Sequence, residues 1–168
     1  MSIKGIDGLT LLNNAVRVER DGYRFYLHLA KSVSDKRLMD LFHLFAEDEL
    51  RHEHAFRKMI EEAVLSPGGM EDEAEALLKH FLEDMRQFGE RQVKKALEGE
   101  LDREALLEVA IQLEKDSILF YSSLKPHLSS ESREVFESII DEELRHLSRL
   151  FAIRQGEIDP SIGMAEDI

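Results

Sequence analysis

Two glutamate–histidine pairs in this chain have the spacing of metal ligands on a helix. The tetrapeptide ELRH occurs at residues 49–52 and again at 143–146. In each copy the Glu and the His are three positions apart, so on an α-helix their side chains share a face. Carboxylate and imidazole groups on one face can bind a metal ion together. One such pair in a chain with 35 acidic residues could be coincidence, so the rest of the sequence has to decide.

An internal duplication supports the metal-binding interpretation. The segment AVRVERDGYRFYLHL at 15–29 aligns with AIQLEKDSILFYSSL at 110–124. With an offset one residue shorter, FHLFAEDELRH at 42–52 aligns with FESIIDEELRH at 136–146. The duplication therefore includes whole helical hairpins rather than four letters, and each half repeats a glutamate, an aromatic pair and a Glu-x-x-His.

The first segment of each half contributes one more glutamate, Glu19 or Glu114. Each lies on an otherwise apolar stripe with a tyrosine seven positions later, because seven residues fall only about 20° short of two helical turns. The stripes around the two Glu-x-x-His pairs are apolar as well. We therefore expect six side chains to face the protein interior together: Glu19, Glu49, His52, Glu114, Glu143 and His146.

Four glutamates in a dry interior need compensation, because buried ionised carboxylates are either neutralised or coordinate a metal. Two divalent cations would balance their four negative charges. Cysteine is absent, which excludes thiolate sites, and ligation by oxygen with one imidazole per ion suits iron or manganese. The sequence predicts that Glu19, Glu49 and His52 serve one ion, that their counterparts in the second half serve the other, and that some carboxylates bridge the two ions.

The elements that position these residues are expected to be helices. Apolar residues recur at three- and four-residue intervals, and no segment alternates with period two as a strand does. Clusters of Gly and Pro separate the helical segments. Helices are predicted at about 9–33, 35–65, 71–97, 102–127 and 129–154. The second has Ser34 or Asp35 as its N-cap, and the last starts at Ser129 or Ser130. Two hairpins joined by a long crossover with an extra helix make an all-α four-helix bundle.

Composition limits the other possibilities. The 168 residues are expected to form one domain over 1–168, with an irregular tail at 156–168. No apolar run approaches the roughly 20 residues that span a bilayer, and no signal peptide is evident, so a cytoplasmic protein without membrane contact is expected. The net charge of −13 disfavours nucleic acid as a partner, because phosphates would not be neutralised.

The motifs VERDGYRFY with DELRH, and LEKDSILFY with EELRH, resemble the di-iron domain of the rubrerythrins within the ferritin-like superfamily. The resemblance extends over about residues 10–154. It implies a ferritin-like bundle, two iron ions cycling between Fe2+ and Fe3+, and reduction of hydrogen peroxide or O2 by an oxidoreductase. It also implies an external electron donor and a homodimer. Whether Mn2+ or Zn2+ takes the place of iron is left open.

Two departures from the family pattern affect the function. Rubrerythrins typically carry a cysteine-containing rubredoxin domain, which this chain lacks, and an extra Glu at the position of Ser117, whose counterpart is Gly22. The six-ligand site is therefore more similar to that of bacterioferritin. Two alternative functions remain: an iron-storage or ferroxidase protein, and a non-catalytic helical interaction module that retains the metal site.

Several neighbours of the six residues have alternative roles. Tyr26 and Tyr121 either reach the glutamate of the opposite half, since their helices would run antiparallel, or are ordinary core residues. Arg51 and Arg145 are expected to form surface ion pairs. The remaining acids near the site are expected on solvated or interfacial faces rather than on the free nitrogens of the histidines: Asp21, Asp48, Asp116 and Glu142. The helix at 71–97 is expected to pack on the bundle or on a second subunit.

Overall fold

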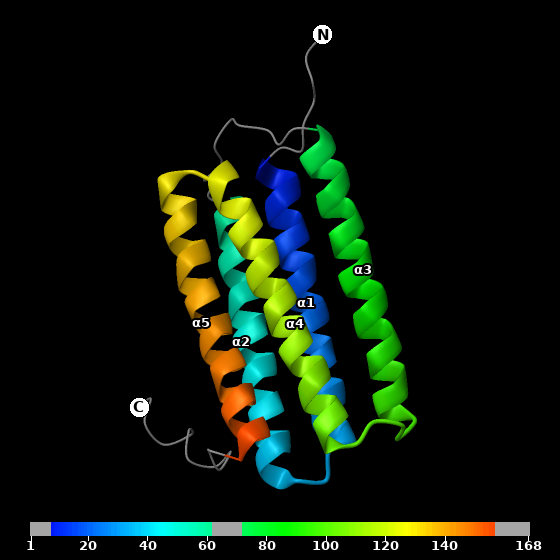
Figure 1. Ribbon diagram of the computed structural model, residues 1–168. Helices are drawn as coiled ribbons and strands as arrows, with labels where there is room; N and C mark the ends of the chain where they lie inside the picture. Colours follow the sequence, from blue (N-terminus) through cyan, green and yellow to red (C-terminus); the bar gives the residue numbers. More distant parts are fainter. Residues whose placement is uncertain (1–7, 62–71, 157–168) are drawn as a thin grey trace, which may run out of the picture.

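The computed structural model describes residues 8–61 and 72–156, and these residues are almost entirely helical (Figure 1). Within this part of the chain no β-strand occurs. A short 3-10 turn, η1, occupies Lys125–His127. The α-helices are α1 at Gly8–Ser32, α2 at Lys36–Glu61, α3 at Asp72–Leu97, α4 at Arg103–Leu124 and α5 at Ser130–Gln155.

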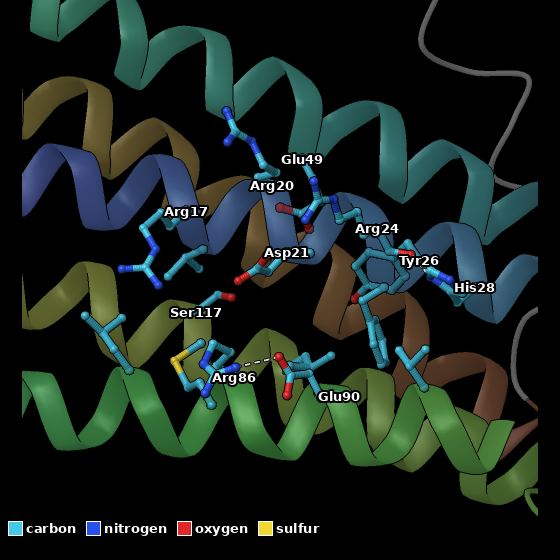
Figure 2. Close-up of a pocket in the computed structure, with 18 of the residues that line it drawn as sticks. Arg17, Arg20, Asp21, Arg24, Tyr26, His28, Glu49, Arg86, Glu90 and Ser117 are labelled. Atoms are coloured by element: carbon cyan, nitrogen blue, oxygen red, sulfur yellow. Dashed lines mark hydrogen bonds and ion pairs between the residues drawn. The ribbon is translucent and has the colours of Figure 1, made fainter. Parts of the chain in front are cut away.

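The helices form a four-helix bundle with one helix added on its side. Helices α1 and α2 make one hairpin, α4 and α5 make the other, and α3 belongs to the crossover between them (Figure 1). Helix α3 packs against α1 and α4, and a pocket lies between these three helices (Figure 2). The prediction of an all-α four-helix bundle built from two hairpins is confirmed, with α1 antiparallel to α4 and α2 antiparallel to α5.

The helix ends follow local chemistry. The backbone N–H of Arg37 donates to the Asp35 side chain at 2.9 Å, and Ser129 caps α5 by accepting from the Ser132 N–H at 3.2 Å. Helix α5 ends at Gln155, and the next residue, Gly156, has a φ of 72°, a conformation that favours glycine. The predicted helix at 102–127 stops instead at Leu124, because Pro126 has no N–H to continue α-helical bonding.

Some predicted boundaries cannot be compared. Residues 62–65 of the predicted second helix lie outside the described residues, as does the predicted tail at 156–168 except for Gly156. None of the described helices is both long and apolar enough to cross a lipid bilayer.

The core consists of two apolar clusters with a polar layer between them. One cluster includes Phe42, Phe45 and Leu107 near one end of the bundle. The other includes Phe56 and Phe136 near the opposite end. The six candidate ligands come from the middle of each helix, between these clusters, so the apolar layers exclude water from both sides of the candidate site.

The cap of α4 makes a specific prediction about stability. Asp102 accepts the backbone N–H of Ala105 at 2.9 Å, which satisfies one otherwise unpaired donor of the first helical turn. Asp102→Ala is expected to lower the free energy of unfolding by about 1 kcal/mol, whereas Asp102→Asn, which keeps the acceptor, should change it little. Urea unfolding of both variants checks this, and an equal loss in the two would contradict the capping role.

Candidate metal centre

The structure brings together all six residues that the sequence predicts as ligands. Each is at most 5% exposed, although all six are ionisable. Glutamates and histidines are seldom fully buried unless their charges are compensated. The residues come from four helices: Glu19 from α1, Glu49 and His52 from α2, Glu114 from α4, and Glu143 and His146 from α5.

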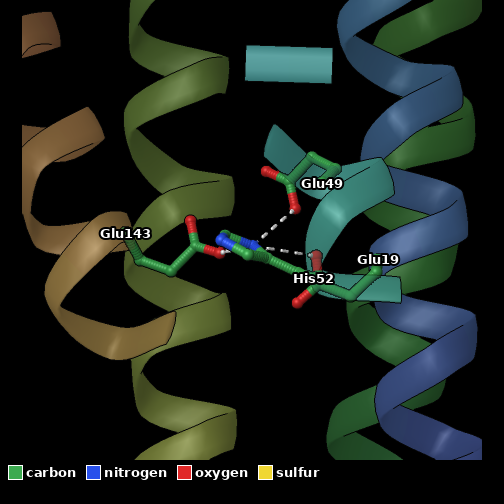
Figure 3. Close-up of side chains that lie close together, drawn as sticks. All are labelled: Glu19, Glu49, His52 and Glu143. Carbon is green, nitrogen blue, oxygen red and sulfur yellow. Dashed lines mark ion pairs between the residues drawn. The ribbon is translucent and has the colours of Figure 1, made fainter. Parts of the chain in front are cut away.

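The six side chains form two overlapping groups. In one, ligand atoms of Glu19, Glu49, His52 and Glu143 lie within 4.8 Å of one another (Figure 3). The other group has the same spread and consists of Glu49, Glu114, Glu143 and His146. Glu49 and Glu143 belong to both groups, so they lie between two candidate metal positions. Each metal position thus has candidate ligands from both hairpins, whereas the sequence-based prediction assigns one ion to each half.

Several atoms facing the centre of this cluster lack hydrogen-bond partners. They are Nδ1 of both histidines, Oε2 of Glu114 and both carboxylate oxygens of Glu143. Nδ1 of His52 approaches Glu143 Oε1 to 3.1 Å without hydrogen-bond geometry. Buried polar atoms are almost always bonded, and a group of unpartnered oxygen and nitrogen atoms facing one another is what a metal ion would satisfy. The donor set therefore fits two metal ions.

The outer nitrogens of the two histidines are held by carboxylates. Nε2 of His52 lies 3.0 Å from Glu142 Oε2, and Nε2 of His146 lies 2.8 Å from Asp48 Oδ2. Such bonds fix the ring orientation and leave Nδ1 to face the centre. The expectation that Asp48 and Glu142 lie on solvated or interfacial faces is therefore wrong. The physical reason is the antiparallel packing of α2 and α5, which brings each acid beside the histidine of the opposite hairpin.

The sequence contained one signal for these two partners. The duplication pairs Asp48 with Glu142, and each acid immediately precedes a candidate ligand glutamate. The other two acids considered do not bond the histidines. Asp116 accepts a hydrogen bond from Gln112 at 2.8 Å, and Asp21 lines the pocket beside α3.

One arginine joins the outer carboxylates of both histidines. Arg51 donates to Asp48 and, at 3.2 Å, to Glu142. Its side chain is 59% exposed, so it does form the expected surface ion pairs, but with the acids that orient the histidines. Its counterpart Arg145 donates to the Asp141 backbone carbonyl of its own helix, at 3.1 Å. The two halves therefore differ at this position.

Two tyrosines cross the bundle to the glutamates of the opposite half. Tyr26 donates to Glu114 Oε1, and Tyr121 donates to Glu19 Oε1 at 2.5 Å. Of the two roles considered from sequence, the structure has the hydrogen-bonded one. Burial and the Glu114 charge raise the pKa of Tyr26, and burial and the Glu19 charge raise that of Tyr121. Both phenols therefore remain protonated donors.

The buried charges raise the pKa values of several candidate ligands. Burial, together with the charge of Glu143, raises the pKa of Glu114 to about 8. Burial also raises the pKa of Glu49, with Glu19 as the next cause. Burial alone would lower the pKa of His52, but its hydrogen bond to Glu142 and the nearby carboxylate of Glu143 outweigh burial and raise the pKa. Without a metal, protons thus carry out part of the charge compensation.

Gly22 and Ser117 occupy equivalent positions beside the centre. A Cβ atom at Gly22 would lie 3.3 Å from Cδ of Glu49, so the missing side chain leaves room for that glutamate. Ser117, like Gly22, lines the pocket between α1, α3 and α4. Neither residue provides a carboxylate, so the described site has six candidate ligands.

The sequence matches a known protein family over more than half of its length. The family model for rubrerythrin matches residues 10–107, more than half of the chain. The chain belongs to the rubrerythrin family. The match covers the first hairpin, α3 and the start of α4.

A solved structure extends the likeness to nearly the whole chain. It is a Thermotoga maritima protein described as a ferritin-like diiron-carboxylate protein, with a TM-score of 0.67 and 24% sequence identity. The alignment covers 92% of this rubrerythrin-family chain and 98% of that chain. At this identity the likeness shows the fold. No curated protein matches the sequence.

The protons in the metal-free centre predict how metal binding depends on pH. Because the pKa of Glu114 is higher in the fold than in the unfolded chain, the metal-free fold holds a proton that the unfolded chain has lost between about pH 4.5 and 8. The metal-free protein is therefore expected to lose stability as pH rises through this window. Metal must displace the proton, so apparent affinity for Fe(II) should rise about tenfold per pH unit for each proton released.

Anaerobic Fe(II) titrations between pH 5.5 and 8, with proton release followed in weakly buffered solution, check this dependence. An affinity that does not change with pH, with no proton release, would contradict it.

The bond from Asp48 to His146 predicts a loss of metal affinity. Asp48→Asn keeps the size of the side chain but removes the charge that orients the imidazole. We expect affinity for Fe(II) to fall about 10- to 100-fold, the usual effect of losing such a partner. Glu47→Gln is the matched control, because Glu47 is the exposed neighbour on the same helix. Equal affinities for the two variants would show that the bond to His146 has no role in metal binding.

Proposed function

We propose that this rubrerythrin-family protein binds two iron ions in the six-residue centre and reduces hydrogen peroxide or O2. The observation that carries the proposal is the pair of overlapping ligand groups, which share Glu49 and Glu143 and contain the unpartnered atoms. Oxygen and imidazole donors of this kind suit iron, and manganese is the nearest alternative. Iron bound there would supply the electrons for reduction of the oxidant.

The protein's own residues would hold the site in one geometry. Tyr26 and Tyr121 each fix one carboxylate by hydrogen bonding, and the bonds to Glu142 and Asp48 fix the two imidazoles. The shared Glu143 is 0% exposed, so water does not compete for its oxygens. Preorganised ligands of this kind need little rearrangement when the charge of the centre changes.

The charge arrangement supports a change of oxidation state. Glu143 keeps a lowered pKa despite its burial and the charge of Glu49, because Glu114 and the two histidines lie beside it and favour its ionised form. Glu49 and Glu114 are protonated more easily. The centre thus contains both an ionised carboxylate and, in Glu114 with its pKa of about 8, a group that takes up or releases a proton near neutral pH. Protons are consumed when peroxide or O2 is reduced.

Access to the centre is available from one side. The pocket beside α3 reaches Glu49, Glu114 and Tyr26, whereas the two ends of the bundle are closed by apolar clusters. A small oxidant can therefore approach the shared glutamate without passing through the core. A homodimer, an external electron donor and a cytoplasmic location remain predictions from the resemblance and composition.

Anaerobic iron loading tests the proposal. The wild-type protein is expected to bind about two Fe(II) per chain, the number of ligand groups that the structure forms. Adding peroxide or O2 should then produce near-ultraviolet absorbance as Fe(II) is oxidised, and the faster of the two oxidants identifies the preferred substrate. Metal analysis of natively purified protein decides between iron, manganese and zinc.

Two variants on α5 sharpen this test. Glu143→Ala removes the carboxylate shared by both groups and is expected to abolish oxidation and reduce iron below one ion per chain. Glu134→Ala, an exposed position on the same helix, should behave like the wild type. Iron binding well below one ion per chain in the wild type would overturn the proposal.

A further inference from the structure

A pocket of about 450 Å³ lies between α1, α3 and α4 and ends at the metal centre (Figure 2). Its inner end is formed by Glu49, Glu114 and Tyr26. Helix α3 forms the outer wall with residues such as Arg86 and Glu90, which face α1 across the opening. The pocket thus connects the surface of the molecule with two of the candidate metal ligands.

The pocket is much larger than the proposed oxidants require. A water molecule, similar in size to O2 or peroxide, takes up only about 30 Å³ of liquid. Pockets that bind small organic ligands measure roughly 300–1,000 Å³. A volume of about 450 Å³ therefore matches a small organic molecule rather than a passage for a diatomic oxidant.

The space exists because small residues face it from three helices. Gly22 comes from α1, Gly89 from α3 and Ser117 from α4. A Cβ added at Gly89 would meet nothing within 4 Å, so this part of α3 stands clear of its neighbours. Larger side chains at these positions would occupy the pocket.

The pocket is apolar along its walls and basic at its rim. Four arginines line it against only two acids other than the candidate metal ligands, in a chain whose net charge is −13. The acids are Asp21 and Glu90 and the arginines are Arg17, Arg20, Arg24 and Arg86. The apolar side chains that line it are Val18, Phe25, Leu82, Met85, Val93 and Leu113.

Two of the arginines have no carboxylate within ion-pair distance in the described part of the chain. Arg20 is paired with Glu53 at 2.9 Å, and Arg86 is paired with Glu83 and Glu90. Arg17 and Arg24, by contrast, form no ion pair within 4 Å among residues 8–61 and 72–156, although the charge of Asp21 attracts both at longer range. Arg17 and Arg24 together carry two positive charges against the single negative charge of Asp21. An incoming anion is therefore still attracted to this part of the rim, and guanidinium binds carboxylates well.

We propose that this pocket binds a small amphipathic carboxylate, with its charged head between Arg17 and Arg24 and its apolar body among Leu82, Met85 and Leu113. The far end of such a ligand lies next to Glu49 and Glu114, beside the metal centre. The inference requires the pocket and not the reaction of iron, so it stands or falls separately from the proposed function.

Octanoate is a suitable probe, and its binding is measured by isothermal titration calorimetry on the anaerobic Fe(II)-loaded protein and on the metal-free protein. Saturable binding of one octanoate per chain is expected, at least tenfold tighter than acetate, which lacks the apolar body. Octylammonium, which has the same body and the opposite charge, should not bind. Equal binding of octanoate and octylammonium, or no binding of octanoate, overturns the inference.

Charge-matched variants test the role of the rim. Replacing both Arg17 and Arg24 with alanine is expected to weaken octanoate binding at least tenfold. The control variant replaces Arg91 and Arg103 with alanine and should bind octanoate as the wild type does. Both residues are exposed and do not line the pocket. Equal losses in the two double variants would show that only overall charge matters and would overturn the assignment of the head group.

A second pair of variants tests the location. Gly89→Leu adds a large side chain to the pocket from α3, a helix that carries none of the candidate metal ligands. Leucine favours a helix more than glycine does, so the fold is expected to persist. Octanoate binding should be lost, whereas the control Asp84→Leu, exposed on the same helix and outside the lining, should retain it. Unchanged binding in Gly89→Leu overturns the inference.

Iron stoichiometry measured on the same samples separates the two hypotheses. Binding of two iron ions per chain without octanoate binding would leave the proposed function intact and overturn the proposal of a pocket ligand. Octanoate binding in a protein that binds no iron would support the pocket ligand and overturn the proposed function.

Discussion

Four glutamates in a water-excluding layer are the constraint on which the rest of this structure depends. Their carboxylates cannot remain ionised together without compensation, and the surrounding groups supply it in stages. Two histidines and raised carboxyl pKa values provide it in the metal-free protein, and cations replace the protons when metal binds. The apolar clusters at either end make this compensation necessary, because they keep out the water that would otherwise solvate the charges. Fold stability and metal affinity are thus two aspects of one electrostatic problem.

The supporting hydrogen bonds cross from one hairpin to the other. From the first half, Tyr26 bonds Glu114 and Asp48 bonds His146. From the second half, Tyr121 bonds Glu19 and Glu142 bonds His52. Neither hairpin therefore contains a complete set of ligands with its supports. A duplicated sequence has in this way produced a site that exists only when both copies pack against each other.

Much of this arrangement could be predicted from the sequence, and the missing parts share a physical cause. Glu19, Glu49 and their repeats could be placed because helical periodicity is a local property, and the tyrosines followed from the same stripes. The partners of the histidines depend on how α2 and α5 face each other, a relation between distant segments that no periodicity encodes. The pocket depends likewise on where α3 packs. The end of α4 at Leu124 is predictable from the sequence, because Pro126 follows two residues later.

The contact between Gly22 and Glu49 has a consequence for how this sequence can change over time. A side chain at position 22 would press on the carboxyl group of Glu49, with only 3.3 Å between that group and the first added carbon. A descendant that gains a side chain there must also reposition the glutamate at 49, which both metal positions share. Positions 22 and 49 are therefore expected to covary among relatives. The two halves of the duplication thus differ beside the centre, with a glycine in the first half and a serine in the second.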